Sequence, residues 1–433
     1  MRRDKNMDKK QEIQDEVQLI QDLFDGIDNG DFNNFGETSD KYTFKYLKAI
    51  WDLQTVLDGG KELYKQIYEI AIKCGIRHVQ QKYKTGRKIK VAFLTISAAE
   101  WPAESVYRLL KMNENVEAYL VVGPLIDRSV ENMEDAFEKT ASFFEKRGYD
   151  VRRAYDSKNK KVRLWEEIGK PDIVIHLTHW YKSLPEEYQI ENYPFTILNC
   201  YIPYAMSLAD NAKGTFMINS SNNSMFLNMM WHIYTDTMYH YEGYREYQLL
   251  GGENVVFTGF PKMDFFYNKI ENTSDQLMLM ANWKYPTGCD PKNMKKVIIA
   301  PHHTFLGYGG ILYSTFQWNM YFWIYLAKKY ENQISFIFKP HPNLRTRAIE
   351  AEVFRDAGDY ERYIDLWEKL PNARVSAEES YLEIFATSDG MIMDSNSFLA
   401  EYMYVNKPLL FLTREEQTFN KLGRSCLLYT SDA

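Results

Sequence analysis

The chain contains little of what marks disulfide-stabilised, zinc-binding or membrane-spanning proteins. Its 433 residues include four scattered cysteines, without a CxxC motif or a metal-type pairing with histidine: Cys74, Cys200, Cys289 and Cys426. A reduced, cytoplasmic compartment is therefore expected. No stretch approaches the run of about 20 apolar residues that spans a bilayer. No apolar segment follows the charged start MRRDKNMDKKQEIQDE, so no signal peptide is predicted.

Positive charge is also in short supply. The formal net charge is −7, which argues against nucleic acid as a partner. The acidic residues form no paired DxD motif at a strand end, so neither a metal ion nor another cofactor is expected. Apolar and aromatic residues, by contrast, are abundant at 45% and 15%, with 32 tyrosines. So many tyrosines favour a carbohydrate or nucleotide cleft or a membrane-interface face, and a merely tyrosine-rich surface is the alternative.

The spacing of apolar residues predicts three regions. Residues 1–86 read as a helical appendage, whose aromatic residues either lie on a membrane or, as we prefer, cover the next domain. Residues 87–283 and 284–425 each alternate apolar strands with helices. This pattern predicts an α/β fold with two Rossmann-like, doubly wound parallel sheets. Within the first of these domains, residues 216–244 are expected to be helical at their centre.

A stretch near the end of the chain, MIMDSNSFLAEYMYVNKPLLFL, predicts a strand, a polar turn, a short helix and another strand. Its turn consists of Asp394, Ser395, Asn396 and Ser397. These residue types cap helices, and a single one suffices for that. A helix N-terminus with hydroxyls beside it also suits a phosphate group. Both interpretations fit this stretch alone.

Polar loops follow three predicted strands of the second domain and favour the phosphate interpretation. They are residues 301–304 (PHHT), 339–343 (KPHPN) and 394–397 (DSNS). Two tandem doubly wound domains bind ligands in the crevice between them, at the carboxyl ends of the strands. We therefore expect the three loops to converge on one rim.

The order of these elements resembles a known family. TGFPKMD, APHHT, FKPHP, SYLEIFATSD and MIMDSNSFLAEYMYVNKPLLFL follow one another between residues 254 and 423. This set is similar to the CDP-glycerol glycerophosphotransferase family, which includes the teichoic acid primases and polymerases. The resemblance implies a GT-B-like fold, with two Rossmann-like domains facing a cleft. It also implies transfer of glycerol phosphate from CDP-glycerol to a hydroxyl of a teichoic, cell-wall or capsular polymer, with release of CMP.

The resemblance assigns roles to residues at matching motif positions. His341 would contact phosphate, Ser395 and Ser397 would bind it at the helix start, and Glu401 would reach the nucleotide. His302 is expected nearer the ligand than His303, and either could be structural; His341 could be a turn residue between two prolines. The further expected substrate-binding residues are His303, Lys339, Asp394, Asn396, Pro261, Lys262 and Asp264.

One departure from the family concerns the general base. The family carries a His-Gly-Thr-Pro turn in its first domain, whereas this chain has Cys200-Tyr201 at the matching place. Tyr201 is the catalytic candidate there, and it is expected to line the acceptor side with Tyr204. His176 and His179 are alternative bases, unless they are only strand-end packing residues. The protein could instead be a non-catalytic nucleotide-binding relative, or a GT-B enzyme that uses a nucleotide sugar.

Two further expectations concern the partners and the end of the chain. A nucleotide-activated donor and a lipid-linked polymer acceptor would place the protein in the cytoplasm, peripherally on the inner face of the membrane. Residues 426–433 resemble a translated sequencing adapter, so the genuine chain is expected to be truncated near Ser425.

Overall fold

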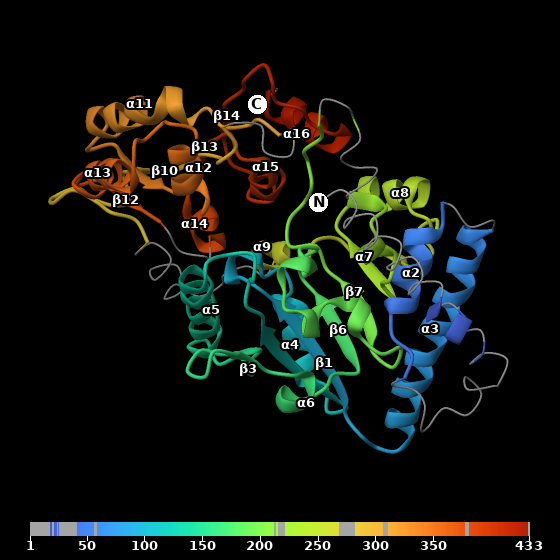
Figure 1. Cartoon of the computed structure of the whole chain (residues 1–433). Helices are drawn as coiled ribbons and strands as arrows, with labels where there is room; N and C mark the ends of the chain where they lie inside the picture. Colours follow the sequence, from blue (N-terminus) through green and yellow to red (C-terminus); the bar gives the residue numbers. More distant parts are fainter. Residues whose placement is uncertain are drawn as a thin grey trace, which may run out of the picture. The chain divides into compact units, whose positions relative to one another are not determined.

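The computed structural model describes residues 41–55, 59–211, 221–267, 282–305, 311–376 and 381–431, together with residues 18–19, 21–23, 25 and 214. The chain divides into two compact units (Figure 1). Unit 1 comprises Met1–Tyr204 and Asn222–Lys262, and unit 2 comprises Ala205–Ser221 and Met263–Ala433. Most of the first 40 residues of the predicted appendage lie outside the described residues.

Unit 1 is built on a seven-stranded parallel sheet of order β3-β2-β1-β6-β7-β8-β9. Its strands are β1 (Ile89–Thr95), β2 (Val116–Val122), β3 (Val151–Arg153), β6 (Ile173–His176), β7 (Leu198–Tyr201), β8 (His232–Thr235) and β9 (Val255–Phe257), beside a small β4 (Tyr155–Asp156) and β5 (Lys161–Val162) pair. Its helices are α2 (Lys45–Leu53), α3 (Gly60–Lys84), α4 (Glu104–Met112), α5 (Val130–Glu145), α6 (Trp165–Ile168), α7 (Met225–Asn228) and α8 (Met238–Tyr247). Short 3-10 turns include η1 (Ala98–Glu100) and η6 (Pro261–Met263).

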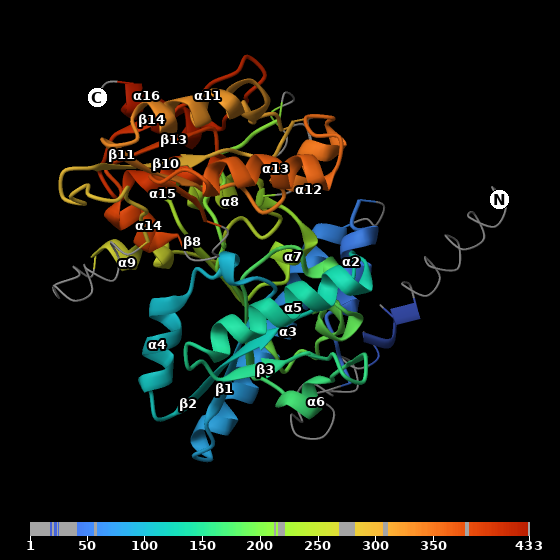
Figure 2. The ribbon, with the colours of Figure 1, turned by 90° about the vertical axis from the view of Figure 1, so that its left-hand side faces the viewer.

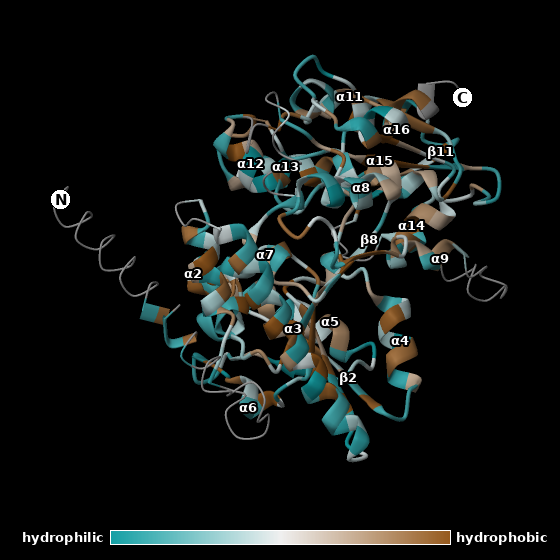
Figure 3. Cartoon of the chain, turned by 90° about the vertical axis from the view of Figure 1, so that its right-hand side faces the viewer, coloured by the Kyte–Doolittle hydropathy of each residue, from teal (hydrophilic) through white to brown (hydrophobic). Residues whose placement is uncertain are grey.

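Alternating residues of β1 fill the two cores of unit 1. Val91 and Phe93 pack in a cluster with residues of α4 and α5, the helices seen across the sheet in Figure 2. Ala92 and Leu94 point to the other face, into a cluster that includes buried residues of α2 and α3. Hydrophobic colour along β2 in Figure 3 reflects the same burial on both faces. The helices α2 and α3 therefore cover the sheet, as the sequence favoured.

Unit 2 has a five-stranded parallel sheet of order β12-β11-β10-β13-β14. Its strands are β10 (Lys295–Ala300), β11 (Ile334–Phe338), β12 (Ala373–Val375), β13 (Gly390–Met393) and β14 (Leu409–Phe411). Its helices are α9 (Asp264–Tyr267), α11 (Phe316–Lys329), α12 (Leu344–Glu350), α13 (Ala357–Glu368), α14 (Leu382–Thr387), α15 (Asn396–Met403) and α16 (Lys421–Ser431). Phe338 stacks on Trp367 of α13, with ring centroids 5.0 Å apart, at the centre of one core.

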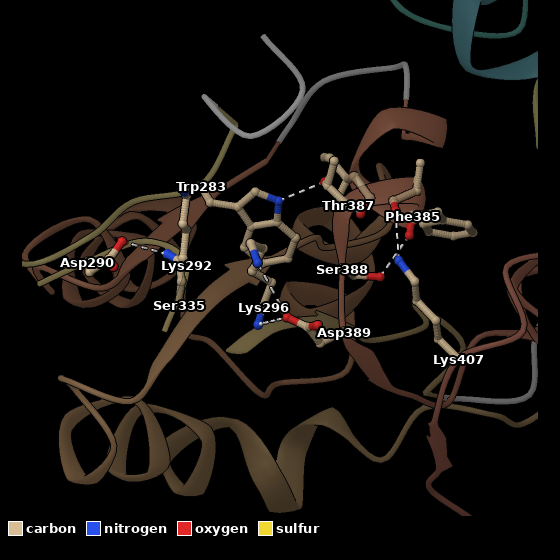
Figure 4. A network of polar contacts seen from close by, with 12 residues as sticks. Trp283, Asp290, Lys292, Lys296, Ser335, Phe385, Thr387, Ser388, Asp389 and Lys407 are labelled. Atoms are coloured by element: carbon tan, nitrogen blue, oxygen red, sulfur yellow. Dashed lines mark hydrogen bonds and ion pairs between the residues drawn. The ribbon is translucent and has the colours of Figure 1, made fainter. Parts of the chain in front are cut away.

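A polar network closes the amino end of this sheet, opposite the loops predicted to bind ligand (Figure 4). The backbone N–H of Lys296 donates to Asp389 Oδ2 at 2.8 Å, just before β13 begins. The indole N–H of Trp283 donates to Thr387 Oγ1 at 2.8 Å, and Lys407 Nζ donates to the Ala386 carbonyl at 2.7 Å. These contacts satisfy polar groups at the end of α14 and fix the start of β13. The network therefore belongs to the amino edge of the sheet and not to the carboxyl edge, where the predicted ligand loops lie.

The predicted fold class is confirmed, because both units are α/β structures with parallel, doubly wound sheets. The expectation of a helix at the centre of residues 216–244 is wrong, since β8 lies there as a sheet strand between two short helices. Residues 421–431 form α16, which runs through Cys426, and the adapter origin of the tail stays a prediction. Among the described residues, no helix is long and apolar enough to cross a membrane.

Candidate functional site

The strand order of unit 2 identifies one place on its sheet where ligands are expected. β10 and β13 are neighbours, and the connections lead outward in opposite directions from them. In doubly wound sheets, ligands bind outside the carboxyl ends of the strands at such a switch point. Pro301 follows β10 and Asp394 follows β13, so two of the three predicted polar loops lie here. The third loop begins at Lys339, after the neighbouring strand β11.

Asp394 ties these loops together from inside the unit. Its side chain is fully buried, and one carboxylate oxygen accepts the backbone N–H of His302 at 2.5 Å. The other oxygen accepts the backbone N–H of Thr315 at 2.5 Å and its hydroxyl at 2.8 Å. Burial raises the pKa of Asp394 to about 6, although these hydrogen bonds lower it. The structure thus gives Asp394 a positioning role, and its predicted contact with substrate stays a prediction.

Three histidine rings gather at this edge. The rings of His303 and His341 are stacked, with centroids 3.8 Å apart and planes 26° apart. The ring of His302 lies 4.5 Å from that of His303 and 5.5 Å from that of His341. His302 is buried, whereas His303 and His341 are partly exposed. The expectation that the loops bring these three residues together agrees with this geometry.

The three imidazoles are held neutral. Burial lowers the pKa of His303 to about 4 and lowers that of His302 and His341 well below the usual value. The secondary causes are Arg347 for His303, Lys339 for His341, and the cost of placing a second charge beside a neighbouring histidine. Nδ1 of His341 accepts the backbone N–H of Asn343 at 3.1 Å, so the neutral ring carries its proton on Nε2. Within the described part of the chain, Nδ1 of His303 is buried without a hydrogen-bond partner. The cluster therefore offers both N–H donors and an unused ring nitrogen.

The N-terminus of α15 lies beside this cluster in the sheet order. Ser395 is the N-cap residue, yet its side chain makes no capping hydrogen bond in the described structure. Asn396 Oδ1 is buried and lacks a hydrogen-bond partner among the described residues. The simple capping interpretation therefore fails for Ser395. Helix N-termini present free N–H groups and a partial positive charge, which favour an anion.

The remaining predicted residues of unit 2 fall into two groups. Glu401 on α15 is buried and accepts the hydroxyl of Tyr381, so its carboxylate is directed into the unit. Lys339 is also buried, with Nζ 5.8 Å from the centroid of the Tyr381 ring. Ser397 is partly exposed, and Asp264 is exposed at the start of α9. The ligand contacts expected of these residues stay predictions.

Three predicted residues belong to unit 1. Tyr201 ends β7, is 5% exposed and lies with its hydroxyl 3.5 Å from His179 Nδ1. Burial raises the pKa of Tyr201 well above its usual value, so its hydroxyl keeps its proton near neutral pH. Lys262 is buried and donates to the carbonyls of Ala99 and Tyr204, whereas Pro261 before it is partly exposed. Lys262 thus holds two loops of unit 1 together.

Sequence reasoning missed several residues that shape these edges. Thr304 accepts the backbone N–H of Tyr313 and lies 2.8 Å from His302 Nδ1, which fixes the orientation of that ring. Thr315 and Tyr381 hold the buried carboxylates of Asp394 and Glu401. Glu100, five residues beyond β1, was also missed. The switch-point rule applied to unit 1 could have found Glu100, whereas contacts such as Thr315 with Asp394 leave no local signal.

The histidine cluster could also hold a metal ion. Its three ligand atoms lie within 4.8 Å of one another, and neutral imidazoles are common ligands of zinc and related ions. The stacking of His303 on His341 does not aim both rings at one point, so a metal would require one ring to turn. The sequence-based expectation of no metal stays a prediction, and this cluster is where it can be tested.

Parallel, doubly wound sheets define the α/β class of this protein, and polar loops follow the strands of unit 2 at their carboxyl edge. Residues 242–429 match the model of a family described as CDP-glycerol:poly(glycerophosphate) glycerophosphotransferase. The resemblance stated from the sequence is thus confirmed for this part of the chain, and the matched family is one of transferases.

Individual relatives are distant. The teichoic acid poly(ribitol-phosphate) polymerase of Bacillus spizizenii is 26% identical over 161 residues, which are 37% of this chain and 22% of that protein. A structure of a variant of the wall teichoic acid polymerase TagF covers 91% of this chain and 79% of its own, with 11% identity and a TM-score of 0.46. A UDP-GlcNAc 2-epimerase from Neisseria meningitidis bound to UDP-GlcNAc covers 79% and 85%, with 15% identity and a TM-score of 0.42.

Proposed function

We propose that the protein transfers glycerol phosphate from CDP-glycerol to a hydroxyl of a cell-wall, teichoic or capsular polymer precursor and releases CMP. The family match over residues 242–429, most of which belong to unit 2, supports the reaction class. The observation that carries the proposal is the switch point of unit 2. There, three neutral histidines lie next to a helix N-terminus whose N-cap side chain is unused in the described structure.

The donor's phosphates would lie against this edge. The backbone N–H groups of α15 and the hydroxyls of Ser395 and Ser397 would donate to phosphate oxygens, and His341 Nε2–H would donate from the opposite side. His302 would hold His303 and His341 in place through ring packing. In-line phosphoryl transfer depends mostly on positioning and on stabilising charge in the transition state. Neutral donors can supply both effects, and the negative charge of a bound phosphate would raise the pKa of His341 so that the ring can protonate.

Thermal shift with nucleotides tests the proposal directly. A ligand that binds only the folded state raises the unfolding midpoint. CMP and CDP-glycerol should stabilise the wild-type protein, and His341→Ala should lose that stabilisation. His232→Ala is the matched control, because His232 is a partly buried histidine of unit 1 and should leave the shift unchanged.

The same titration separates the alternatives. Stabilisation by UDP- or GDP-sugars in place of CDP-glycerol would show a nucleotide-sugar transferase. Stabilisation by CDP-glycerol without any CMP release in the presence of acceptor would show a non-catalytic binding protein. Absence of a shift with every nucleotide would contradict donor binding altogether.

We also propose that the protein acts at a membrane surface, where a lipid-linked acceptor would be found. Helix α11 supports this, because one face of it exposes four aromatic side chains at helical spacing: Trp318 (62% exposed), Tyr321 (64%), Phe322 (53%) and Tyr325 (54%). Lys328 and Lys329 follow in its last turn, and the guanidinium of Arg414 lies 5.0 Å from the Trp318 ring. Tryptophan and tyrosine favour the membrane interface, and nearby cations favour anionic lipids.

Sedimentation with lipid vesicles tests this surface. The wild-type protein should bind phosphatidylglycerol vesicles more strongly than phosphatidylcholine vesicles. The double variant Tyr321→Ser and Phe322→Ser should lose most of that binding. Tyr83→Ser removes an equally exposed aromatic ring from α3 and should bind as the wild type does. Equal binding by all three proteins would contradict a membrane role for α11.

A further inference from the structure

The sheet of unit 1 has its own switch point, between β1 and β6, which lie side by side at the centre of the sheet in Figure 1. The chain leaves β1 at Thr95 and makes the short turn η1, which ends at Glu100. It leaves β6 at His176 and reaches His179 three residues later. Ligands of doubly wound sheets bind at this position, so the residues of these two loops are candidates for contact with a substrate.

Glu100 carries a carboxylate oxygen, Oε2, that is buried without a hydrogen-bond partner among the residues described, although the side chain as a whole is partly exposed. Glu191 Oε2 in unit 1 shares this feature, but the Glu191 carboxylate is paired with Lys182 through Oε1. Nearby Glu104 is the contrast, because its carboxylate accepts from Trp101, Arg108 and Tyr149. Burying a carboxylate oxygen without a hydrogen-bond partner generally costs several kcal/mol of hydration free energy. Such an oxygen therefore needs an explanation other than stability, and a catalytic role is one.

The surroundings of Glu100 bring its pKa close to neutral pH, which suits proton transfer. Burial raises the pKa of Glu100 to about 7, and the positive charges of Lys262 and Arg128 oppose that rise. Its own charge in turn raises the pKa of Tyr204 and Tyr201, in both cases as a contribution smaller than burial. A general base works best when its pKa lies near the working pH.

Other groups at this edge are poorer bases. The thiol of Cys200 packs into the core between the sheet and α4–α5, and burial raises its pKa to about 12. Tyr201 keeps its proton, as described above. His176 is buried and bonded to Asn199, while burial lowers the pKa of His179 to about 4, which makes its ring a weak base. Cys200 and Tyr201, which stand where the family has its histidine, are therefore unsuited to act as the general base.

We propose that Glu100 is the general base of the transfer reaction and that the carboxyl edge of unit 1 between β1 and β7 binds the acceptor hydroxyl. This inference rests on the proposed function. The Glu100 carboxylate takes the proton of the acceptor hydroxyl while that oxygen attacks the phosphorus that carries glycerol. The bond from this phosphorus to the bridging oxygen breaks, and CMP leaves with the electron pair. A phosphodiester forms, and Glu100 then releases its proton to water.

Lys262 is a positioning residue in this arrangement. Its ammonium donates to the carbonyl of Ala99, next to Glu100, at 3.3 Å and to the carbonyl of Tyr204 at 3.5 Å. It thereby holds the loop after β1 against the loop after β7. Tyr204, a partly exposed residue, lies on the second loop, where it would contact the acceptor.

The experiment compares wild-type protein, Glu100→Gln and Glu104→Gln in a transfer assay that follows CMP release with acceptor present. Glu100→Gln should lower kcat by about a hundredfold or more, which is the usual contribution of a general base. The wild-type rate should rise with pH near 7, and Glu100→Gln should abolish that rise. CDP-glycerol should still shift its unfolding midpoint, because the donor edge is on unit 2. Glu104→Gln should transfer at the wild-type rate.

A purely structural role for Glu100 predicts different results. Removing the buried charge should leave Glu100→Gln at least as stable as the wild type at pH 8, whereas a structural residue would lose stability together with activity. Arg128→Gln should move the rise of rate to higher pH, because it removes a charge that lowers the pKa of Glu100. Transfer by Glu100→Gln within threefold of wild type, with the pH dependence retained, would overturn the inference alone. Absence of transfer by the wild type with any donor would overturn the proposed function itself.

Discussion

One carboxylate near the switch point of each sheet has a buried oxygen atom, and the two differ in their hydrogen bonds. Asp394 follows β13 at the switch point of unit 2, and its oxygens accept three hydrogen bonds. Glu100 follows β1 at the switch point of unit 1, and its Oε2 has no partner within the described ranges. Burial raises the pKa of both, to about 6 and about 7. The hydrogen bonds of Asp394 hold the loops of unit 2 together, whereas Oε2 of Glu100 has no hydrogen bond within the described ranges.

The difference extends to the whole edge of each sheet. Unit 2 presents neutral imidazoles and an uncapped helix start, which are hydrogen-bond donors suited to an anion. Unit 1 presents a carboxylate of raised pKa among tyrosine hydroxyls, which suits a neutral hydroxyl whose proton must be removed. Each edge, taken by itself, therefore offers different chemistry: hydrogen-bond donors in unit 2 and a proton acceptor in unit 1.

Asp394→Ala should produce the largest change in stability. The substitution leaves the buried N–H groups of His302 and Thr315 without their acceptor, and each such group costs about 1–3 kcal/mol. We expect a loss of about 3 kcal/mol in the free energy of unfolding, measured by urea titration. Glu100→Ala, in which no hydrogen bond to Oε2 is lost, is the matched control. A smaller loss for Asp394→Ala than for the control would break the contrast between the two carboxylates.

Ser397→Ala and Ser395→Ala test whether these two hydroxyls of unit 2 bind the donor phosphate or stabilise the helix. Replacing a capping serine usually costs about 1 kcal/mol. Because Ser395 makes no capping hydrogen bond in the described structure, we expect both variants to stay within about 0.5 kcal/mol of wild-type stability. A hydrogen bond to a charged phosphate contributes about 1.5–3 kcal/mol, so donor affinity should fall about tenfold or more. Isothermal titration with CMP measures this; unchanged affinity in both variants would remove the hydroxyls from the donor site.

The fold was largely readable from the sequence because its signals are local. Apolar runs such as KIKVAFLTI and ISFIFKPHP predicted β1 and β11, and the amphipathic ESVYRLLKM predicted α4, whose bounds agree. The strand β8 was missed because HIYT is short and half-buried and stands between two helical segments. Its strand conformation depends on pairing with β7 and β9, which is a tertiary effect that periodicity does not record.

The candidate site was readable only in part. The rule on strand ends placed the loops of His302, His341 and Ser395 on one edge, and the described structure agrees. The same rule did not separate residues that face a ligand from those that hold the loops, because that depends on contacts such as Thr315 with Asp394, 79 positions apart. Glu100 escaped notice because a single glutamate after a strand carries no motif and the switch-point rule was applied only to unit 2; its unpartnered Oε2 is visible only in the structure.

The pH dependence of stability gives a smaller but directional test of the histidine cluster. His303 has a folded-state pKa of about 4, below its ordinary value of 6.5, so the unfolded chain binds more protons between these two values. Stability should therefore fall as the pH is lowered from about 6.5 toward 4. His303→Gln should reduce that fall between pH 7 and pH 5 by on the order of 1 kcal/mol, measured by urea titration at both pH values. An unchanged pH dependence would show that His303 is hydrated and accessible to protons in the folded protein.

The smallest expected effect is that of metal removal. If the histidine cluster is neutral and metal-free, with His341 as the donor to phosphate, dialysis against EDTA should leave the transfer rate of the wild-type protein unchanged. Added Zn²⁺ should then compete with the donor, because binding it requires the ring nitrogens of His302, His303 and His341 to turn toward one point. The apparent inhibition constant of Zn²⁺ for the wild-type protein should rise with donor concentration. Zn²⁺ should inhibit the His303→Gln variant less. A loss of transfer on EDTA treatment, restored by Zn²⁺, would instead make the cluster a metal centre and remove the neutral imidazoles from the comparison between the two edges.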